Sequence, residues 1–502
     1  MNVTIYSRTI KLTAARILYW LTLGGFFLYL ATDLAYNTAF VDEAIYATVG
    51  EEVLRGSYWE NALTWMGGSY LYPIISATIN RHFGLAGVRM FSIFCVLTAG
   101  VTSSKIAEVL SGKRAALIAL IAFLTSAVSL NVGQLGTYDA PAVLFFSLAT
   151  YLAIVTSNLK GYRQIPAIFF SALFFALAVL SKYIAIILLP VVGLLVLTRT
   201  RFSIPKTLLW GIVASIVIGS FTLLEYEQLY IFFTGGAFKE YTSRVKIIAE
   251  AWKYLHVFIP LAFAGGLVTF LKKPDKRVLI SILLLGSIVP FGYHFGSANI
   301  RSMWKHMIFS LLFLVPIAAV TLESAYLRFR TWARNNQILI NASHIFVTIA
   351  FLTVGSLLWN NLREHWVFQR SWPSATNVLQ ILAANRHDDD IIFAEGSAVF
   401  KYHLFAGFAR PESWTSTWYM EYEGQSGVPA MIAAIKDRHF DFVILNGYFT
   451  GDIVYELRPY LAEYYTLLFE DTYKLSGVYD TTTSLWVPKD ALREYSALPT
   501  LE

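Results

Sequence analysis

The composition of this 502-residue chain excludes an ordinary soluble globular protein. Hydrophobic residues make up 56% of the chain and charged residues 14%, whereas a typical soluble domain carries about 25% charged residues. The single cysteine, Cys95, lies in an apolar run, which excludes a disulfide framework. These features predict a polytopic α-helical membrane protein, and the formal net charge of +6 is best explained by its loops.

Apolar segments long enough to cross a bilayer begin at residues 16–34. No small-residue cleavage pattern follows this segment, so we interpret it as a retained first helix and not a cleaved signal. A window of about 20 residues per crossing predicts about eleven membrane helices. The other ten segments are 86–104, 114–130, 140–156, 165–180, 183–198, 207–224, 256–271, 278–293, 306–322 and 338–358.

The stretch 165–198 is too long for one crossing and short for two. As one helix its 34 residues would reach roughly 50 Å. We predict a tight turn at Ser181 and Lys182, because Arg163 and Arg199 would otherwise lie on opposite sides of the membrane.

Basic residues fall on alternate loops between the predicted helices. Since cytoplasmic loops carry an excess of Lys and Arg, we predict that these loops are cytoplasmic and that the first loop, 35–85, lies outside. The basic residues are Lys11, Arg16, Lys105, Lys113, Arg114, Lys160, Arg163, Arg199, Arg201, Lys206, Lys272, Lys273, Lys276, Arg277, Arg328, Arg330 and Arg334.

The first outer loop contains two adjacent acids, Asp42 and Glu43, in the stretch "NTAFVDEAIYATVGEEVLRG". One interpretation is purely structural, because Asp42 would be a good N-cap for a helix from Glu43 to Leu54. The other interpretation is catalytic, because a neutral Asn or Ser would cap as well without the cost of desolvating a carboxylate beside a membrane.

The pattern changes near residue 360. The segments "DIIFAE" and "DFVILN" predict strands and "VPAMIAAIKDRHF" predicts a helix, so residues 360–502 form an α/β domain. By the parity of the crossings this domain is extracytoplasmic, after a membrane module of residues 1–359. The acids Asp388 to Asp390 favour a turn before a strand, because no metal-ligand spacing accompanies them. We expect no metal, cofactor or nucleic-acid partner, since no zinc spacing, phosphate loop or nucleic-acid motif occurs.

Few charges remain at the predicted outer ends of the helices. Each has a structural interpretation: Asp139 could cap the helix opened by Pro141, while Lys182 and Lys305 could extend to lipid headgroups. Together, however, acids and bases gathered at a membrane surface suit a lipid phosphate and an incoming hydroxyl group. This chemistry predicts transfer of a sugar from a polyprenyl phosphate. The charged residues concerned are Asp42, Glu43, Asp139, Lys182, Arg301, Lys305 and His306.

The order of motifs resembles that of the GT-C fold glycosyltransferases, which include protein O-mannosyltransferases and lipid A aminoarabinose transferases. The resemblance runs across roughly the first 320 residues, through "VDEAIYATVGEEVLRGSYWE", "GGSYLYPII", "GLAGVRMFSIFCVLTAG", "GKRAALIALIAFLTS", "LGTYDAPAVLFFSLATYLA", "FALAVLSKYIAIILLP" and "WKHMIFSLLFLVPIA". It implies that the catalytic base is Asp42, with Glu43 beside it, and that Asp139 is the second acid. It also implies basic residues for the lipid phosphate, which match Lys182 and Lys305.

One departure from the family pattern concerns the first loop. Where relatives commonly have Lys-Pro-Pro-Leu, this chain has Tyr72-Pro73-Ile74. A phosphate-binding lysine is therefore missing there, and Lys182, Arg301 or Lys305 must replace it. Several aromatic residues of the loop would contact the sugar or acceptor, or form an interfacial belt: Tyr58, Trp59, Trp65, Tyr70 and Tyr72.

The function we predict is an integral glycosyltransferase of the cell (inner) membrane. It would move a sugar from a polyprenyl-phosphate donor to a hydroxyl acceptor on a lipid, glycan or protein, by inverting in-line displacement with Asp42 as general base. A lipid or sugar transporter or flippase is the alternative, although such proteins usually show two similar halves and broken helices. A receptor with an outer sensing domain is a third class, which would leave the first-loop acids without a role.

Overall fold

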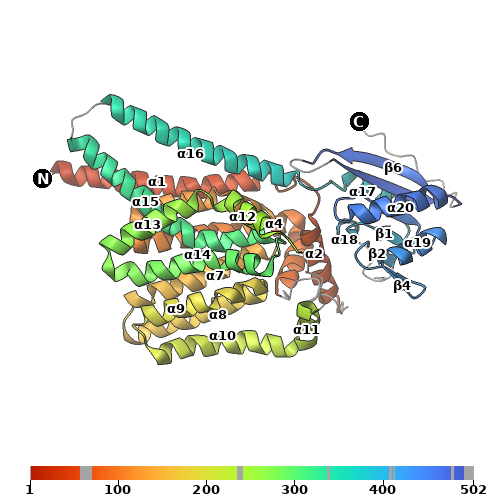
Figure 1. Cartoon of the computed structure of the whole chain (residues 1–502), viewed down its shortest axis with the longest axis horizontal. Coiled ribbons are helices and arrows are strands. Elements are labelled where there is room, and N and C mark those ends of the chain that lie inside the picture. Colours follow the sequence, from red (N-terminus) through yellow and green to blue (C-terminus); the bar gives the residue numbers. More distant parts are fainter. Residues whose placement is uncertain are drawn as a thin grey trace. The chain divides into compact units, whose positions relative to one another are not determined.

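The computed structural model consists of two compact units (Figure 1). It describes residues 2–56, 71–234, 241–335, 340–405, 410, 413–475 and 480–490. The first unit contains Met1–Leu34, Glu60–Tyr72 and Ala86–His365. The second contains Ala35–Trp59, Pro73–Leu85 and Trp366–Glu502, so part of the predicted outer loop belongs to the same unit as the C-terminal residues. The predicted boundary between residues 359 and 360 stays a prediction.

The first unit is helical, and each predicted apolar segment overlaps a helix, although residues 338–339 of the last segment lie outside the described residues. Its helices are α1 (Asn2–Ala31), the second part of α4 (Leu71–Ser111), α5 (Lys113–Leu124), α6 (Ala127–Gln134), α7 (Asp139–Val155), α8 (Gln164–Ser181), α9 (Leu189–Arg199), α10 (Ile204–Leu224), α11 (Tyr226–Thr234), α12 (Arg244–Leu255), α13 (Phe258–Lys272), α14 (Arg277–Ser297), α15 (Met303–Asn335) and most of α16 (Ile340–Gln369).

Within the described residues, six helices are long and apolar enough to cross a membrane, or up to eight if each bent pair is one span. Two shorter apolar helices cover Arg16–Ala31 and Tyr183–Arg199. The predicted segment 114–130 is not one straight helix, because α5 and α6 meet at 61°. Ser126 begins α6 and its hydroxyl accepts a hydrogen bond from the Ser129 amide, as an N-cap does. The predicted number of eleven crossings is therefore not confirmed.

The predicted turn at Ser181 and Lys182 is confirmed. Lys182 has an extended backbone (φ −150°, ψ 111°), and the short 3-10 helix Tyr183–Leu188 leads into α9. At the far end of α9, the Arg199 guanidinium donates to the Ile154 carbonyl at 3.0 Å. Ile154 lies at the end of α7, close to where α8 begins. The end of α9 has therefore returned to the start of α8, so the chain reverses direction between these two helices.

Two predicted cytoplasmic loops meet at one end of the first unit. The ammonium groups of Lys273 and Lys276 donate to the Leu110 and Val109 carbonyls at 2.9 and 2.7 Å. Lysines near a helix C-terminus satisfy carbonyl groups that have no partner within the helix. The predicted grouping of these basic loops on one side therefore agrees with the fold.

Helix α15 lies at the centre of the first unit and contacts α5, α7, α13 and α14. Of its most apolar stretch of 18 residues, 83% is buried, whereas only 11% of the corresponding stretch of α10 is buried. Figure 1 shows α10 at the edge, beside α8 and α9. Between α7 and α15, the Phe146 ring meets Phe309 and Phe313 edge-on, with ring centroids 5.5 and 5.8 Å apart. These rings pack α7 against α15 in the core of the first unit.

Among its described residues, the second unit contains a five-stranded sheet with the order β2-β1-β5-β7-β6. Strand β1 is parallel to β2 and β5, while β7 is antiparallel to β5 and β6. Both predicted strands and the predicted helix are confirmed. The elements are α2 (Val41–Leu54), the first part of α4, α17 (Thr376–Asn385), β1 (Ile392–Ala394), α18 (Ser397–Leu404), β2 (Trp414–Thr415), β3 (Glu421–Tyr422), β4 (Gln425–Ser426), α19 (Val428–Lys436), β5 (Phe442–Leu445), α20 (Gly451–Tyr464), β6 (Tyr465–Tyr473) and β7 (Thr481–Pro488).

Helix α2 of the first loop packs against α18 within the second unit. The Lys401 ammonium donates to the Glu52 carboxylate at 2.8 Å, and the Tyr402 hydroxyl donates to the Asn80 side chain at 2.6 Å. The loop before α2 is also held, because the Ala39 amide donates to the His403 ring at 2.9 Å. The C-terminal domain thus fixes both the start and the end of α2.

Candidate active site

Three charged residues predicted at the outer helix ends come together in the first unit. The Lys182 ammonium donates to one Asp139 oxygen, and the Lys305 ammonium lies 3.9 Å from the other. The Thr137 hydroxyl donates to that second oxygen at 3.0 Å. Asp139 opens α7, Lys182 follows α8, and Lys305 lies in the first turn of α15. The chain therefore gathers these side chains by bringing three helix ends together.

The structural interpretations of these residues are wrong. Tyr138 and not Asp139 is the N-cap of α7, and the Asp139 carboxylate is turned to the two lysines. Lys182 and Lys305 are only 2% and 4% exposed, so they do not extend to headgroups. Burying charges is costly even when they are paired, which makes this cluster a functional candidate.

Aromatic rings surround the cluster. The Lys182 ammonium lies 4.7 Å from the centre of the Tyr138 ring, in a cation–π contact. Tyr72 meets Tyr138 edge-on and is fully buried. Trp304 is similarly placed under the Lys305 ammonium, at 5.6 Å. Tyr72, predicted to contact a sugar or acceptor, thus lies in the aromatic surroundings of the lysines.

Two histidines lie beside the lysines. His306 is buried, and its Nδ1 lies 2.7 Å from Nε2 of His294 on α14. The positive charges of Lys182 and Lys305 are close enough to interact electrostatically with the His306 ring. The sequence analysis singled out His306 but missed His294. The available signal was an ionisable residue within an apolar helix, which is a functional-site hypothesis by default.

Arg301 is not buried with Lys305. Its side chain is exposed, and its backbone amide donates to the Asn299 side chain at 2.8 Å. Arg301 lies in the turn before α15, whereas Lys305 lies on the helix and faces Asp139. Of the three basic residues considered for the lipid phosphate, two are therefore in the buried cluster.

Asp42 and Glu43 lie in the second unit, on the first turn of α2. The prediction that Asp42 is the N-cap is wrong, because α2 begins at Val41 and its N-cap is Phe40. The capping bond comes from Glu43, whose carboxylate accepts from the Phe40 amide at 2.8 Å. Glu43 is buried and Asp42 is half-buried. Because Glu43 makes the capping bond, capping of α2 does not account for a carboxylate at position 42.

The other acids of α2 also have structural partners. Glu51 accepts from Arg81 and Arg55, each at 2.7 Å. Burial raises the pKa of the Glu51 carboxyl, but the two guanidinium groups outweigh this effect and the pKa is lowered. Glu52 is paired with Lys401. Both acids hold α2 to its neighbours within the second unit.

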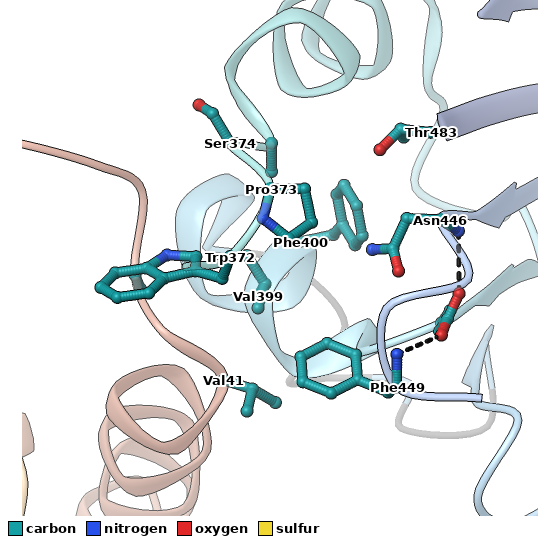
Figure 2. A pocket seen from close by; sticks show the side chains of 12 residues that line it. Val41, Trp372, Pro373, Ser374, Val399, Phe400, Asn446, Phe449 and Thr483 are labelled. Carbon is teal, nitrogen blue, oxygen red and sulfur yellow. Dashed lines mark hydrogen bonds between the residues drawn. The ribbon is translucent and has the colours of Figure 1, made fainter. Parts of the chain in front are cut away.

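A small pocket in the second unit lies where strands β1 and β5 end (Figure 2). Its acid, Glu395, accepts hydrogen bonds from the backbone amides of residues 446, 447, 449 and 450 at 2.5–2.8 Å. Figure 2 shows two of these bonds, from Asn446 and Phe449. A carboxylate that accepts four amides has little capacity left for a substrate. Glu395 therefore orders the loop after β5 and is not a candidate base.

Other predicted site residues, Tyr58, Trp59 and Tyr70, lie outside the described residues, as does Trp65. The described part of the chain holds no group of three or more His, Cys, Asp or Glu side chains that could bind a metal ion. The acid run at Asp388 to Asp390 is a turn before β1, as predicted, in which Asp390 accepts from the His387 amide at 2.8 Å.

Comparison with known proteins identifies the fold. Residues 67–224 match the family model of dolichyl-phosphate-mannose-protein mannosyltransferases. ArnT from Cupriavidus metallidurans, in a crystal structure bound to undecaprenyl phosphate, superimposes with a TM-score of 0.59 at 13% identity, over 95% of this chain and 97% of ArnT. The chain has the GT-C glycosyltransferase fold. The resemblance seen in the motifs is thereby confirmed at the level of the fold.

A second solved structure supports the same assignment. The oligosaccharyltransferase AglB from Archaeoglobus fulgidus, in complex with an inhibitory peptide and a dolichol-phosphate, has a TM-score of 0.55 at 11% identity. The match covers 91% of this chain and 74% of AglB. A sequence search of curated proteins found no match. These identities are too low to carry over the substrates of either protein.

Proposed function

We propose that this GT-C fold protein is a membrane glycosyltransferase that moves a sugar from a polyprenyl-phosphate donor to a hydroxyl acceptor. The buried cluster of Asp139, Lys182 and Lys305 carries this proposal. Two ammonium groups face one carboxylate there, so these three side chains sum to one positive charge. Two ammonium groups held beside each other at a buried place suit an anionic ligand, and a phosphodiester of charge −1 is such a ligand. The family match over residues 67–224 supports the same chemistry.

The proposed reaction is a single displacement at the anomeric carbon with inversion. The acceptor oxygen forms the new bond as the bond to the phosphate oxygen breaks. Lys182 and Lys305 stabilise the departing phosphate, which needs no strong acid because it leaves as a stable anion. Asp139 holds both ammonium groups in place, since it contacts both.

Asp42 is the proposed general base, which takes the proton of the acceptor hydroxyl. The role of Glu43 as the helix cap supports this choice between the two adjacent acids. Glu43 is then a positioning residue for Asp42. Arg301, being exposed, is a candidate only for the first contact with the donor. The proposed orientation has the site and the C-terminal domain outside the cell membrane.

Incorporation of radiolabelled sugar from a polyprenyl-phosphate donor into a membrane acceptor tests the proposal. The purified chain is reconstituted in liposomes with extracted membrane lipids, glycans or proteins as acceptors. We expect label in the acceptor with wild type and at least 100-fold less with Asp42→Asn, because a positioned base contributes about 10²–10⁴-fold. Movement of a labelled lipid or sugar across the bilayer without any incorporation would favour the transporter alternative and contradict the proposal.

A further inference from the structure

The two histidines beside the lysine cluster form a hydrogen-bonded chain with a defined direction. Nδ1 of His294 lies 2.6 Å from the Asn299 carbonyl oxygen. A carbonyl oxygen only accepts, so this Nδ1 carries the hydrogen, and Nε2 of the neutral ring is then an acceptor. Nδ1 of His306 must therefore donate to it across 2.7 Å. The remaining nitrogen, Nε2 of His306, has a lone pair and no hydrogen.

This Nε2 has no hydrogen-bond partner among the described residues, although it is buried and the residue is only 4% exposed. Such an acceptor is costly to keep, and its retention points to a ligand that donates a hydrogen. In the described part of the chain, the charged and titratable groups near it include Asp139 of α7, Lys182 after α8, His294 of α14 and Lys305 of α15. Two neighbouring ammonium groups disfavour a further positive charge on the ring.

We propose that Lys182, Lys305 and His306 bind a phosphate monoester as its singly protonated monoanion. The P–O–H group donates to Nε2 of His306, while the unprotonated oxygens accept from the two ammonium groups. The P–O–H group selects the monoanion, because a dianion has no hydrogen to donate to Nε2 of His306. His294 is a positioning residue that sets the tautomer of His306.

This inference rests on the proposed function, because the released lipid phosphate is a monoester whereas the sugar donor is a diester without a P–O–H group. The atoms balance: a hydroxyl acceptor and a sugar phosphodiester of charge −1 give the glycoside and a phosphate monoester of charge −1. Asp42 first takes the hydroxyl proton as the phosphate leaves as a dianion, and this proton then passes to a phosphate oxygen, which gives the monoanion and restores the Asp42 carboxylate. The cluster therefore distinguishes the product from the donor by one proton.

Binding measured against pH tests the inference. The probes are a soluble short-chain prenyl monophosphate and its methyl ester, titrated into the full chain in detergent between pH 5 and 8.5. Above the second phosphate pKa of about 6, wild type should bind the monoester about tenfold more weakly for each pH unit. Its affinity for the methyl ester should stay constant. Lysines alone would give the opposite trend for the monoester, because they favour the dianion.

Variants locate the effect. His306→Leu should bind the monoester more weakly at pH 5.5 and lose the fall in affinity with pH, and His294→Leu should weaken that fall because the tautomer is no longer set. Ser310→Ala, one helical turn further along α15 and equally buried, should keep the wild-type profile. The comparison of the two probes on wild type remains decisive if a variant does not fold.

Several outcomes overturn the inference. Monoester affinity that rises with pH would show that the site prefers the dianion. Methyl ester affinity that rises together with monoester affinity at low pH would show a protonated His306 that donates. If the protein transfers sugar but its affinity for the monoester lacks the expected pH dependence, the inference alone is overturned. If neither probe binds, the proposed phosphate site is overturned as well.

Discussion

Asp42 and Glu43 are adjacent carboxylates with different surroundings. Glu43 is buried and accepts from the Phe40 amide, so its charge is used at the positive end of α2. Asp42 lies one position earlier and is half-buried. The same helix turn therefore holds one acid as a cap and, in the proposed mechanism, the other acid as the base.

Substitution of the two acids separates these roles. Asp42→Asn should fold normally and lose on the order of 100-fold or more in turnover at saturating donor, because only the proton acceptor is removed. Glu43→Gln should lower turnover less, since an amide oxygen still accepts from Phe40, and its main effect should be on stability, about 0.3–1 kcal/mol, because the negative charge at the positive end of α2 is lost. Turnover and thermal unfolding of both purified variants are the measurements. Near-normal turnover of Asp42→Asn would return the role of base to Glu43 or Asp139.

The ion pair of Asp139 and Lys182 makes an energetic prediction. Asp139→Asn removes the carboxylate charge that both buried ammonium groups contact, so we expect a loss of about 3–5 kcal/mol in stability. The double variant Asp139→Asn with Lys182→Met should recover much of this loss, because it also removes one of the two ammonium groups, but it should stay inactive.

Denaturation midpoints of the single and double variants in one detergent provide the measurement. Lys246→Met, which removes an exposed basic side chain of α12, is the control and should change stability by less than about 0.5 kcal/mol. Equal stability of the single and double variants would show that burial of these charges is not costly.

At the scale of elements, α18 of the C-terminal domain supports α2 of the first loop. Lys401→Met should weaken this contact, since a charge-assisted hydrogen bond contributes about 1.5–3 kcal/mol and Glu52 would lose its partner. Because α2 carries Asp42, we expect kcat to fall several-fold while binding of the lipid phosphate is unchanged. The assays are kcat with saturating donor and binding of a prenyl phosphate.

A double-mutant cycle identifies the contact responsible. Lys401→Met and Glu52→Gln should be less than additive in unfolding free energy, because the two side chains share one bond. Lys436→Met, an exposed lysine of α19, is the control and should leave kcat unchanged. Additive effects of the pair would remove the argument that α18 positions α2.

At the scale of the whole molecule, the arrangement of basic loops predicts the orientation in the membrane. Single cysteines at the exposed positions Lys160 and Tyr455, in a Cys95→Ala background, should react with an impermeant thiol reagent from opposite sides. Position 160 should react from the cytoplasmic side and position 455 from outside, because cytoplasmic loops retain Lys and Arg. Reaction of both positions from the same side would contradict the predicted orientation.

Much of the fold could be predicted from local sequence patterns. Apolar runs of about 20 residues identify membrane helices wherever they occur, and they placed α7, α8, α10 and α14 closely. The alternation of buried strand and amphipathic helix likewise identified β1, α19 and β5. The bend between α5 and α6 was missed. The sequence stays apolar across the break, so hydropathy does not reveal the N-cap at Ser126.

The sequence by itself determined the membrane class, the two strands of the C-terminal domain and the set of charges at one end of the helices. These are properties of the composition and of the periodicity of hydrophobic residues, and each can be recognised within one short segment. Only the tertiary structure decided that Asp139 is paired with Lys182, 43 residues away, and that His294 contacts His306. It also decided that Glu43, not Asp42, caps α2 and that Lys401 holds Glu52, 349 residues away. Such pairings depend on how helix ends pack together and on which rotamers fit there, which no local pattern encodes.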